Sequence, residues 1–96
     1  MTRSDDPSRE ATGFEWDENK RHANIEKHKI DFLDALEIFA DPGRRTVAST
    51  LASHERRFVS VGRIKGRLIA VIWTERNGRI RIISARAARE SYGQDH

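Results

Sequence analysis

The sequence predicts a single α+β domain in which helices come first and strands follow. Two observations lead to this fold class. Residues 18–40 hold two segments with helix-capping residues at their starts, whereas residues 46–84 alternate apolar and polar side chains around turn signals. The length of 96 residues suits one domain with a small core. We therefore expect two helices that back one antiparallel sheet.

The N-terminal part is expected to begin with a disordered polar leader over residues 1–13. The alternation of Phe14–Trp16 is typical of a short strand. Asp17 is then a suitable N-cap for a polar helix over residues 18–28.

A second helix is predicted from the N-cap Asp31 onward. Its apolar residues fall at helical spacing and form a stripe that faces the core: Phe32, Ala35, Leu36 and Phe39. Asp41-Pro42-Gly43 ends this helix and turns the chain.

The second half of the chain predicts an antiparallel meander of three to four strands. They are expected at residues 46–51, 57–63, 67–75 and 79–84. Lys65-Gly66 is a plausible hairpin turn, and Asn77-Gly78 is a strong one, since a type I′ turn needs positive φ at both central residues. The strand at 67–75 is apolar on both faces and is therefore expected to be central.

The C-terminal residues 85–92 favour a short final helix, and residues 93–96 are expected to form a tail. The single domain would then cover residues 14–92.

Charge is divided unevenly along the chain. Residues 44–89 carry a net charge of +10, with 11 arginines, one lysine and two acidic residues, whereas residues 1–43 carry −5. Arginine suits bidentate phosphate contacts and stacking on bases, and a surface that serves only solubility mixes both signs. The basic half therefore favours a polyanion partner over the plainer alternative of a solvated sheet face.

Strand alternation predicts that several of these arginines share one side of the sheet, away from the isoleucines of the last strand. Two more would join them from the expected final helix, where they are three residues apart. The arginines concerned are Arg57, Arg63, Arg79, Arg81, Arg86 and Arg89.

Several separated motifs follow one another along the chain. They are Phe14-Glu15-Trp16-Asp17, Lys20, Asn24, Lys27-His28, Phe32, Asp41-Pro42, Arg57-Phe58-Val59-Ser60-Val61-Gly62 and Arg81-Ile82-Ile83-Ser84-Ala85-Arg86. In this order they resemble the BrnT toxin family over about residues 14–90. The resemblance implies a RelE-like fold and a type II ribonuclease toxin that cuts RNA, inhibits translation and arrests bacterial growth.

The resemblance also implies a partner. A DNA-binding antitoxin of the BrnA type would neutralise the toxin, with two copies of each protein in the complex, and operator DNA would be contacted only through the antitoxin. The family commonly extends its last helix with a Glu and a Tyr. Here Glu90 and Tyr92 are close together in the sequence and Gly93 follows at once, which puts a role for either residue in doubt.

Metal-independent RNA cleavage must deprotonate the 2′-hydroxyl, stabilise the charged phosphorane and protonate the leaving oxygen. Arg57 and Arg81 are candidates for the second task, and Lys27, His28 and Glu55 for proton transfer. Plainer roles stay open: His28 as a helix C-cap, Glu55 as the ion-pair partner of Arg57, and the arginines as an antitoxin-docking surface. Further RNA-binding candidates are Arg63, Arg79, Arg86 and Arg89.

No cofactor or metal site is expected, because the chain lacks cysteine and its histidines have no metal-ligand spacing. It also lacks an apolar run long enough to cross a membrane and the apolar middle of a signal peptide, so a cytoplasmic location is the expectation. The competing function is a non-catalytic nucleic-acid-binding or interaction module that acts as a co-repressor subunit.

Overall fold

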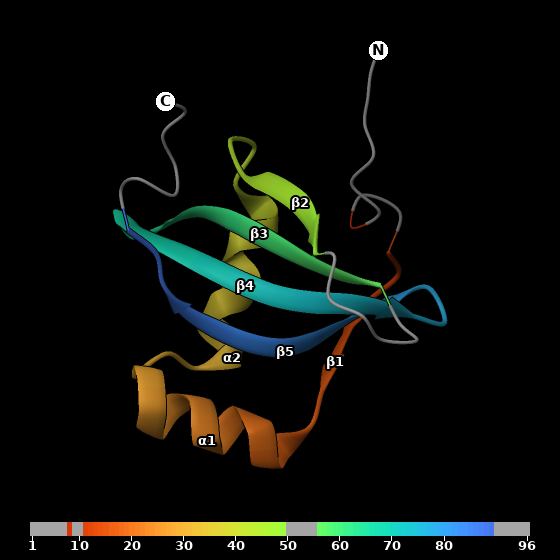
Figure 1. Cartoon of the computed structure of the whole chain (residues 1–96), viewed down its shortest axis with the longest axis horizontal. Coiled ribbons are helices and arrows are strands. Elements are labelled where there is room, and N and C mark those ends of the chain that lie inside the picture. The colour runs from red at the N-terminus through yellow and green to blue at the C-terminus, as the bar shows by residue number, and fades with distance from the viewer. Residues whose placement is uncertain (1–7, 9–10, 50–55, 90–96) are drawn as a thin grey trace.

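The fold is a five-stranded sheet with helices on one face and along one edge (Figure 1). The computed structural model describes residues 8, 11–49 and 56–89. The elements in chain order are β1 (Phe14–Trp16), α1 (Glu18–His28), α2 (Phe32–Ala35), the 3₁₀ helix η2 (Leu36–Ala40), β2 (Arg45–Ser49), β3 (Arg57–Ile64), β4 (Arg67–Arg76) and β5 (Arg79–Ala87). The predicted α+β class is confirmed.

The strand order is β1-β5-β4-β3-β2, with β1 parallel to β5 and every other pair antiparallel. β4 is the central strand, as its two apolar faces predicted. Lys65-Gly66 and Asn77-Gly78 both have positive φ at their two positions, which confirms the two expected hairpin turns. The meander thus has four strands, and β1 adds a fifth at the β5 edge.

Both predicted helix starts are confirmed by their caps. The side chain of Asp17 accepts a hydrogen bond from the Asn19 backbone at 2.8 Å, and that of Asp31 accepts one from the Leu33 backbone at 2.9 Å. α1 ends at Lys29, whose left-handed backbone (φ 62°) lets its N–H bond the Ile25 carbonyl.

The second helical segment differs from its prediction. α-Helix lasts only for α2 and then tightens into η2, which has three residues per turn. Phe32, Ala35 and Ile38 are therefore the fully buried residues, whereas the predicted Leu36 and Phe39 are half-buried at the margin of the core.

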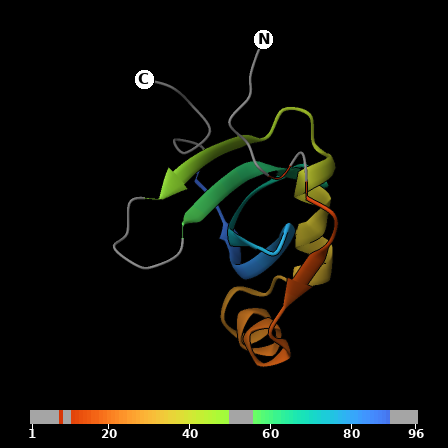
Figure 2. The ribbon, with the colours of Figure 1, turned by 90° about the vertical axis from the view of Figure 1, so that its right-hand side faces the viewer.

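The core lies between α2–η2 and one face of the sheet (Figure 2). Trp73 of β4 is fully buried at its centre. Its ring stacks on Phe58 at 4.6 Å between centroids and meets Phe39 edge-on at 5.8 Å. Asp41 then ties the end of η2 to β3 by accepting the Arg63 N–H at 2.9 Å.

The opposite face of the sheet, called the open face below, is covered by no helix of the described chain (Figure 2). Strand alternation and register assign it Glu15, Arg45, Val47, Arg57, Val59, Val61, Arg63, Leu68, Ala70, Ile72, Thr74, Arg76, Arg79, Arg81, Ser84 and Arg86. The predicted faces of β3 and β5 are thereby confirmed.

The expected final helix over 85–92 is wrong in its first part. β5 continues to Ala87, with Ala85 paired to Val71 and Ala87 to Ile69. Alanine favours helix, but the outer half of β4 needs a hydrogen-bonded partner, and this pairing overrides local propensity. Arg86 is consequently a strand residue and not a helical neighbour of Arg89, while residues 90–92 lie outside the described chain.

Thr12 and Gly13, at the end of the leader expected over residues 1–13, form backbone hydrogen bonds with residues near the start of β5. Thr12 donates its N–H to the Gly78 carbonyl at 2.8 Å, and the Gly13 carbonyl accepts from Ile80 at 2.8 Å. These bonds continue the pairing of β1 with β5 upstream of Phe14. Residues 1–7 and 9–10 lie outside the described chain.

Beyond Ile82, the outer edge of β5 is hydrogen-bonded by a side chain instead of a strand. Asn24 of α1 is buried, and its amide donates to the Ala85 carbonyl (2.8 Å) and the Ile30 carbonyl (2.9 Å). Its oxygen accepts from the Ala85 N–H (3.1 Å) and the Ser84 hydroxyl (3.3 Å). All four hydrogen-bonding positions of the amide are therefore used.

We predict that Asn24→Ala lowers the free energy of unfolding by about 3 kcal/mol, because it leaves buried backbone groups of Ala85 and Ile30 unsatisfied. Urea unfolding followed by circular dichroism measures the loss. Asn19→Ala makes the same chemical change at an exposed position of α1 and should shift stability by less than about 1 kcal/mol. Equal losses in the two variants would contradict the assigned role of Asn24.

A second prediction concerns acid stability. Hydrogen bonds from Arg21, at 2.8 and 3.0 Å, lower the pKa of Asp31 from 3.8 to about 2. A carboxyl with a depressed folded pKa contributes stability above its unfolded pKa, and this is lost as pH falls through the folded value. Stability should therefore decline between about pH 4 and pH 2.

Asp31→Asn keeps a residue able to cap α2 but removes the charge, so the variant should lose less stability over this interval than the wild type. Urea midpoints measured from pH 5 to pH 2 test the difference. Asp34→Asn, at an exposed position of α2, serves as the control. Parallel curves for wild type and Asp31→Asn would refute the linkage.

Candidate functional site

The open face carries a row of polar side chains aligned across four strands. Cross-strand register places Glu15 of β1 beside Arg81 of β5, Arg81 beside Thr74 of β4, and Thr74 beside Arg57 of β3. The α-carbons of Arg57 and Arg81 are separated by two strand spacings, about 9–10 Å. The fold thus brings together two of the predicted catalytic residues.

Arg81 is held in place by Glu15. One carboxylate oxygen of Glu15 accepts from Nη1 of Arg81 at 3.0 Å, and the other lies 3.4 Å from Nε of Arg79. The Glu15 and Arg81 side chains are 28% and 29% exposed, so the ion pair is partly shielded from water. Arg81 makes no other hydrogen bond to a described residue, which leaves Nε and Nη2 available for ligand oxygens.

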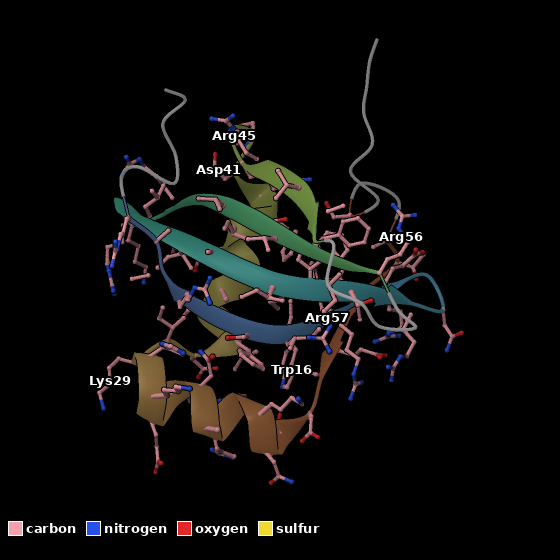
Figure 3. The ribbon with its side chains drawn as sticks, viewed as in Figure 1. Trp16, Lys29, Asp41, Arg45, Arg56 and Arg57 are labelled. Atoms are coloured by element: carbon pink, nitrogen blue, oxygen red, sulfur yellow. The ribbon has the colours of Figure 1, made fainter. Side chains whose placement is uncertain are left out.

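Thr74, a member of this row, holds the start of β3 in place. Its side chain is 2% exposed, and its hydroxyl donates to the carbonyl of Arg56. Arg57, the next residue, is half-buried on the open face. Figure 3 shows Arg56 and Arg57 at one end of the sheet and Lys29 at the far end of α1.

Lys27 and His28 lie elsewhere. They line a pocket of about 170 Å³ between α1 and β5, together with Lys20, Ala23, Asn24, Ile83 and Ser84. Lys27 is exposed and His28 half-buried, and neither makes a hydrogen bond or ion pair with a described residue. Their nearest point on the open face is Ser84, which is paired with Ile72.

The two clusters are adjacent along the sheet. Thr74, in the arginine row, and Ile72, opposite Ser84, are two residues apart on β4, or about 7 Å. The structure therefore places cationic and titratable side chains beside a pair of arginines but not in direct contact with them.

The remaining candidates are dispersed. Arg79 donates to the Phe14 carbonyl at 3.0 Å and so helps to fix β1. Arg63 donates to the Gly66 carbonyl at 3.2 Å at the opposite end of the open face. Arg86 and Arg89 are exposed near the end of β5, and Glu55 lies outside the described residues.

A model of a known protein family covers most of the chain. A family model described as "Ribonuclease toxin, BrnT, of type II toxin-antitoxin system" matches residues 16–91. The chain belongs to the BrnT family. No curated protein matches the sequence.

Several residues of the BrnT-like signature have structural duties. Asp17 caps α1, Asn24 completes β5, Phe32 is fully buried, and Asp41 ties η2 to β3. Three have no hydrogen bond or ion pair to a described residue and instead line the α1–β5 pocket: Lys20, Lys27 and His28. Lys27 and His28 also lie in the last turn of α1, where the helix dipole favours positive side chains.

Two further observations bound the site. Among the described residues, no group of three His, Asp or Glu side chains is arranged to hold a metal ion. No helix in the part of the chain that the structure describes is both long and apolar enough to cross a membrane.

Sequence reasoning missed Glu15, Thr74, Lys20 and Ser84 as parts of the site. The position of Glu15 depends on the parallel pairing of β1 with β5, for which the local sequence gives no signal. Thr74 had a readable signal, because alternation along β4 places it on the same face as Ala70 and Ile72. Ser84 had none, because only the irregular register between Ile72 and Trp73 brings it to the face of Arg81.

Proposed function

We propose that this BrnT-family chain is a RelE-like endoribonuclease that cleaves RNA on the open face without a metal ion. The observation that carries the proposal is the row in which Arg57 and Arg81 flank Thr74. Two guanidinium groups at this spacing, carried on the two strands that flank β4, can approach one phosphate from both sides. They would supply the positive charge that stabilises the phosphorane.

Glu15 supports this role by orienting Arg81. Because each carboxylate oxygen is directed at a different arginine, Glu15 restrains Arg81 while leaving most of its N–H donors for the substrate. Preorganised donors stabilise a transition state without reorganisation at the moment of reaction.

Proton transfer is assigned to the neighbouring pocket. His28 and Lys27 are the titratable groups next to Ser84, and a substrate that spans from the pocket to the arginine row would bring its 2′-hydroxyl or leaving oxygen near one of them. Glu55 remains a candidate base beside Arg56. Arg63, Arg86 and Arg89 would bind the RNA backbone farther along the open face, and Arg79 would do so at the β1 end.

A protein antitoxin is the second partner. The family description places BrnT proteins in type II toxin–antitoxin systems, in which the inhibitor is a protein. We propose that a BrnA-type antitoxin covers the open face in a complex with two copies of each protein, and that operator DNA is reached only through the antitoxin. The +10 charge of residues 44–89 favours an acidic contact surface on that partner.

Arg81→Ala should lower the rate of RNA cleavage by about 100-fold or more, because one donor to the transition-state charge is lost. Its melting temperature should fall by no more than about 8 °C, since a partly exposed ion pair contributes little stability. Cleavage of a labelled single-stranded RNA in EDTA and a thermal melt measure the two effects. Arg67→Ala, at the exposed start of β4 and on the opposite parity from Thr74, is the control and should retain activity.

The same assay separates the competing functions. Tight RNA binding without cleavage by the wild type would replace the enzyme with a binding module. Cleavage that EDTA abolishes would contradict the metal-free mechanism. Unfolding of Arg81→Ala at ordinary temperature would show that Arg81 is structural and that the clamp assignment is wrong.

A further inference from the structure

We infer that the Lys20 end of the pocket between α1 and β5 is a subsite for a phosphodiester of single-stranded RNA, one position away from the phosphate that is cleaved. Lys20 is its principal binding residue, while Lys27 and His28 at the other end keep the proton-transfer role proposed above. The inference rests on the proposed ribonuclease function and adds to it a second binding position and a residue that the cleavage mechanism does not use.

The first argument is the shape of the pocket. Lys20 and Lys27 are seven residues apart on α1, two helical turns, so they point the same way with their α-carbons about 10 Å apart. Ala23 lies between them and keeps the space open. The pocket of about 170 Å³ therefore has a positive group at each end and a small side chain in the middle.

The second argument is the irregularity of β5. Ile72 pairs with Ser84 and Trp73 with Ile82, which leaves Ile83 as an extra residue without a cross-strand partner. Such a bulge alters the local direction of the side chains, and here both Ile83 and Ser84 reach the pocket. β5 thus presents an apolar side chain and a hydroxyl to the pocket where regular alternation would turn one of them away.

The third argument is charge. The residues that line the pocket include two lysines and a histidine but no acid. Asn24 at the base has all its hydrogen-bonding positions used by Ala85, Ile30 and Ser84, so it holds the wall and cannot bind a ligand. Lys20 has no hydrogen bond or ion pair to a described residue. The pocket is therefore complementary to an anion, and Lys20 can bind it as a charged donor.

The fourth argument is position. Ser84 at the pocket and Arg81 in the arginine row are paired with residues two apart on β4, about 7 Å along the strand. Taken along the strands alone, this separation is comparable to the spacing of successive phosphates along an extended nucleic-acid strand, and the pocket lies to the side of it, beyond β5. A strand with one phosphate between Arg57 and Arg81 that crosses β5 would bring a neighbouring phosphate to Lys20, and an unpaired strand can follow this path.

The test measures binding and turnover separately. Lys20→Ala should raise KM for a short single-stranded RNA about fivefold to tenfold and leave kcat within twofold, because Lys20 contacts no reacting atom. Lys29→Gly removes one positive charge from the end of the same helix but outside this pocket, at a left-handed position that glycine adopts easily. This control should change KM by less than twofold.

A methylphosphonate scan locates the contact. Single neutral linkages are placed in turn around the mapped cleavage site of an RNA that carries a 2′-deoxy residue there, so that it binds without being cut. The affinity penalty of Lys20→Ala should vanish when the neutral linkage is next to the scissile phosphate and persist at the other positions. The salt slope of binding should fall by about 0.7 for the lost contact.

An equal penalty at every linkage would show only general attraction, and equal affinities of wild type and Lys20→Ala in a cleaving enzyme would also overturn the subsite while leaving the ribonuclease intact. A wild-type protein that neither binds nor cleaves the RNA would overturn the proposed function itself.

Discussion

The hydrogen bonds between the Asn24 side chain and the backbone of Ala85 determine where α1 lies relative to the sheet. β1 pairs with β5 only as far as Ile82, and beyond that point the edge would leave backbone groups unpaired. A primary amide offers the same donor and acceptor as a strand, so Asn24 satisfies Ala85 from a helix. α1 consequently lies along the edge of the sheet, the open face stays clear, and the lysines of α1 lie beside Ser84.

Local chemistry was sufficient to predict much of the fold. Asp17 and Asp31 cap helices, and Asn77-Gly78 forms a hairpin turn, because each of these features depends on residues within a few positions of one another. The helix predicted over residues 85–92 was wrong in its first part because the structure there depends on residues far away in the sequence. Its alanines favour a helix, but Ala85 is held by β4 on one side and Asn24 on the other, and neither contact can be read from the segment itself.

The predictions for the site also separate into those that the local sequence supports and those that need the three-dimensional arrangement. The faces occupied by Arg57 and Arg81 followed from strand alternation, a local property, and the structure confirms both. Their common row with Glu15 required knowledge that β1 runs parallel to β5. The separation of Lys27 and His28 from the arginines required knowledge of where α1 is placed, so sequence reasoning grouped as one centre what the fold arranges as two neighbouring clusters.

Glu15 reduces the electrostatic repulsion within the arginine row before any ligand binds. Like charges on the two strands that flank β4 repel, and the cost is largest where side chains are half-buried, as Arg57 and Arg81 are. One carboxylate shared between Arg79 and Arg81 offsets part of this repulsion, yet a single negative charge cannot neutralise both of the guanidinium groups that it contacts. The remaining positive potential is what a phosphate would complete. In the proposed function, an anion placed between Arg57 and Arg81 would relieve the same repulsion that Glu15 only partly offsets, so RNA binding would also stabilise the open face.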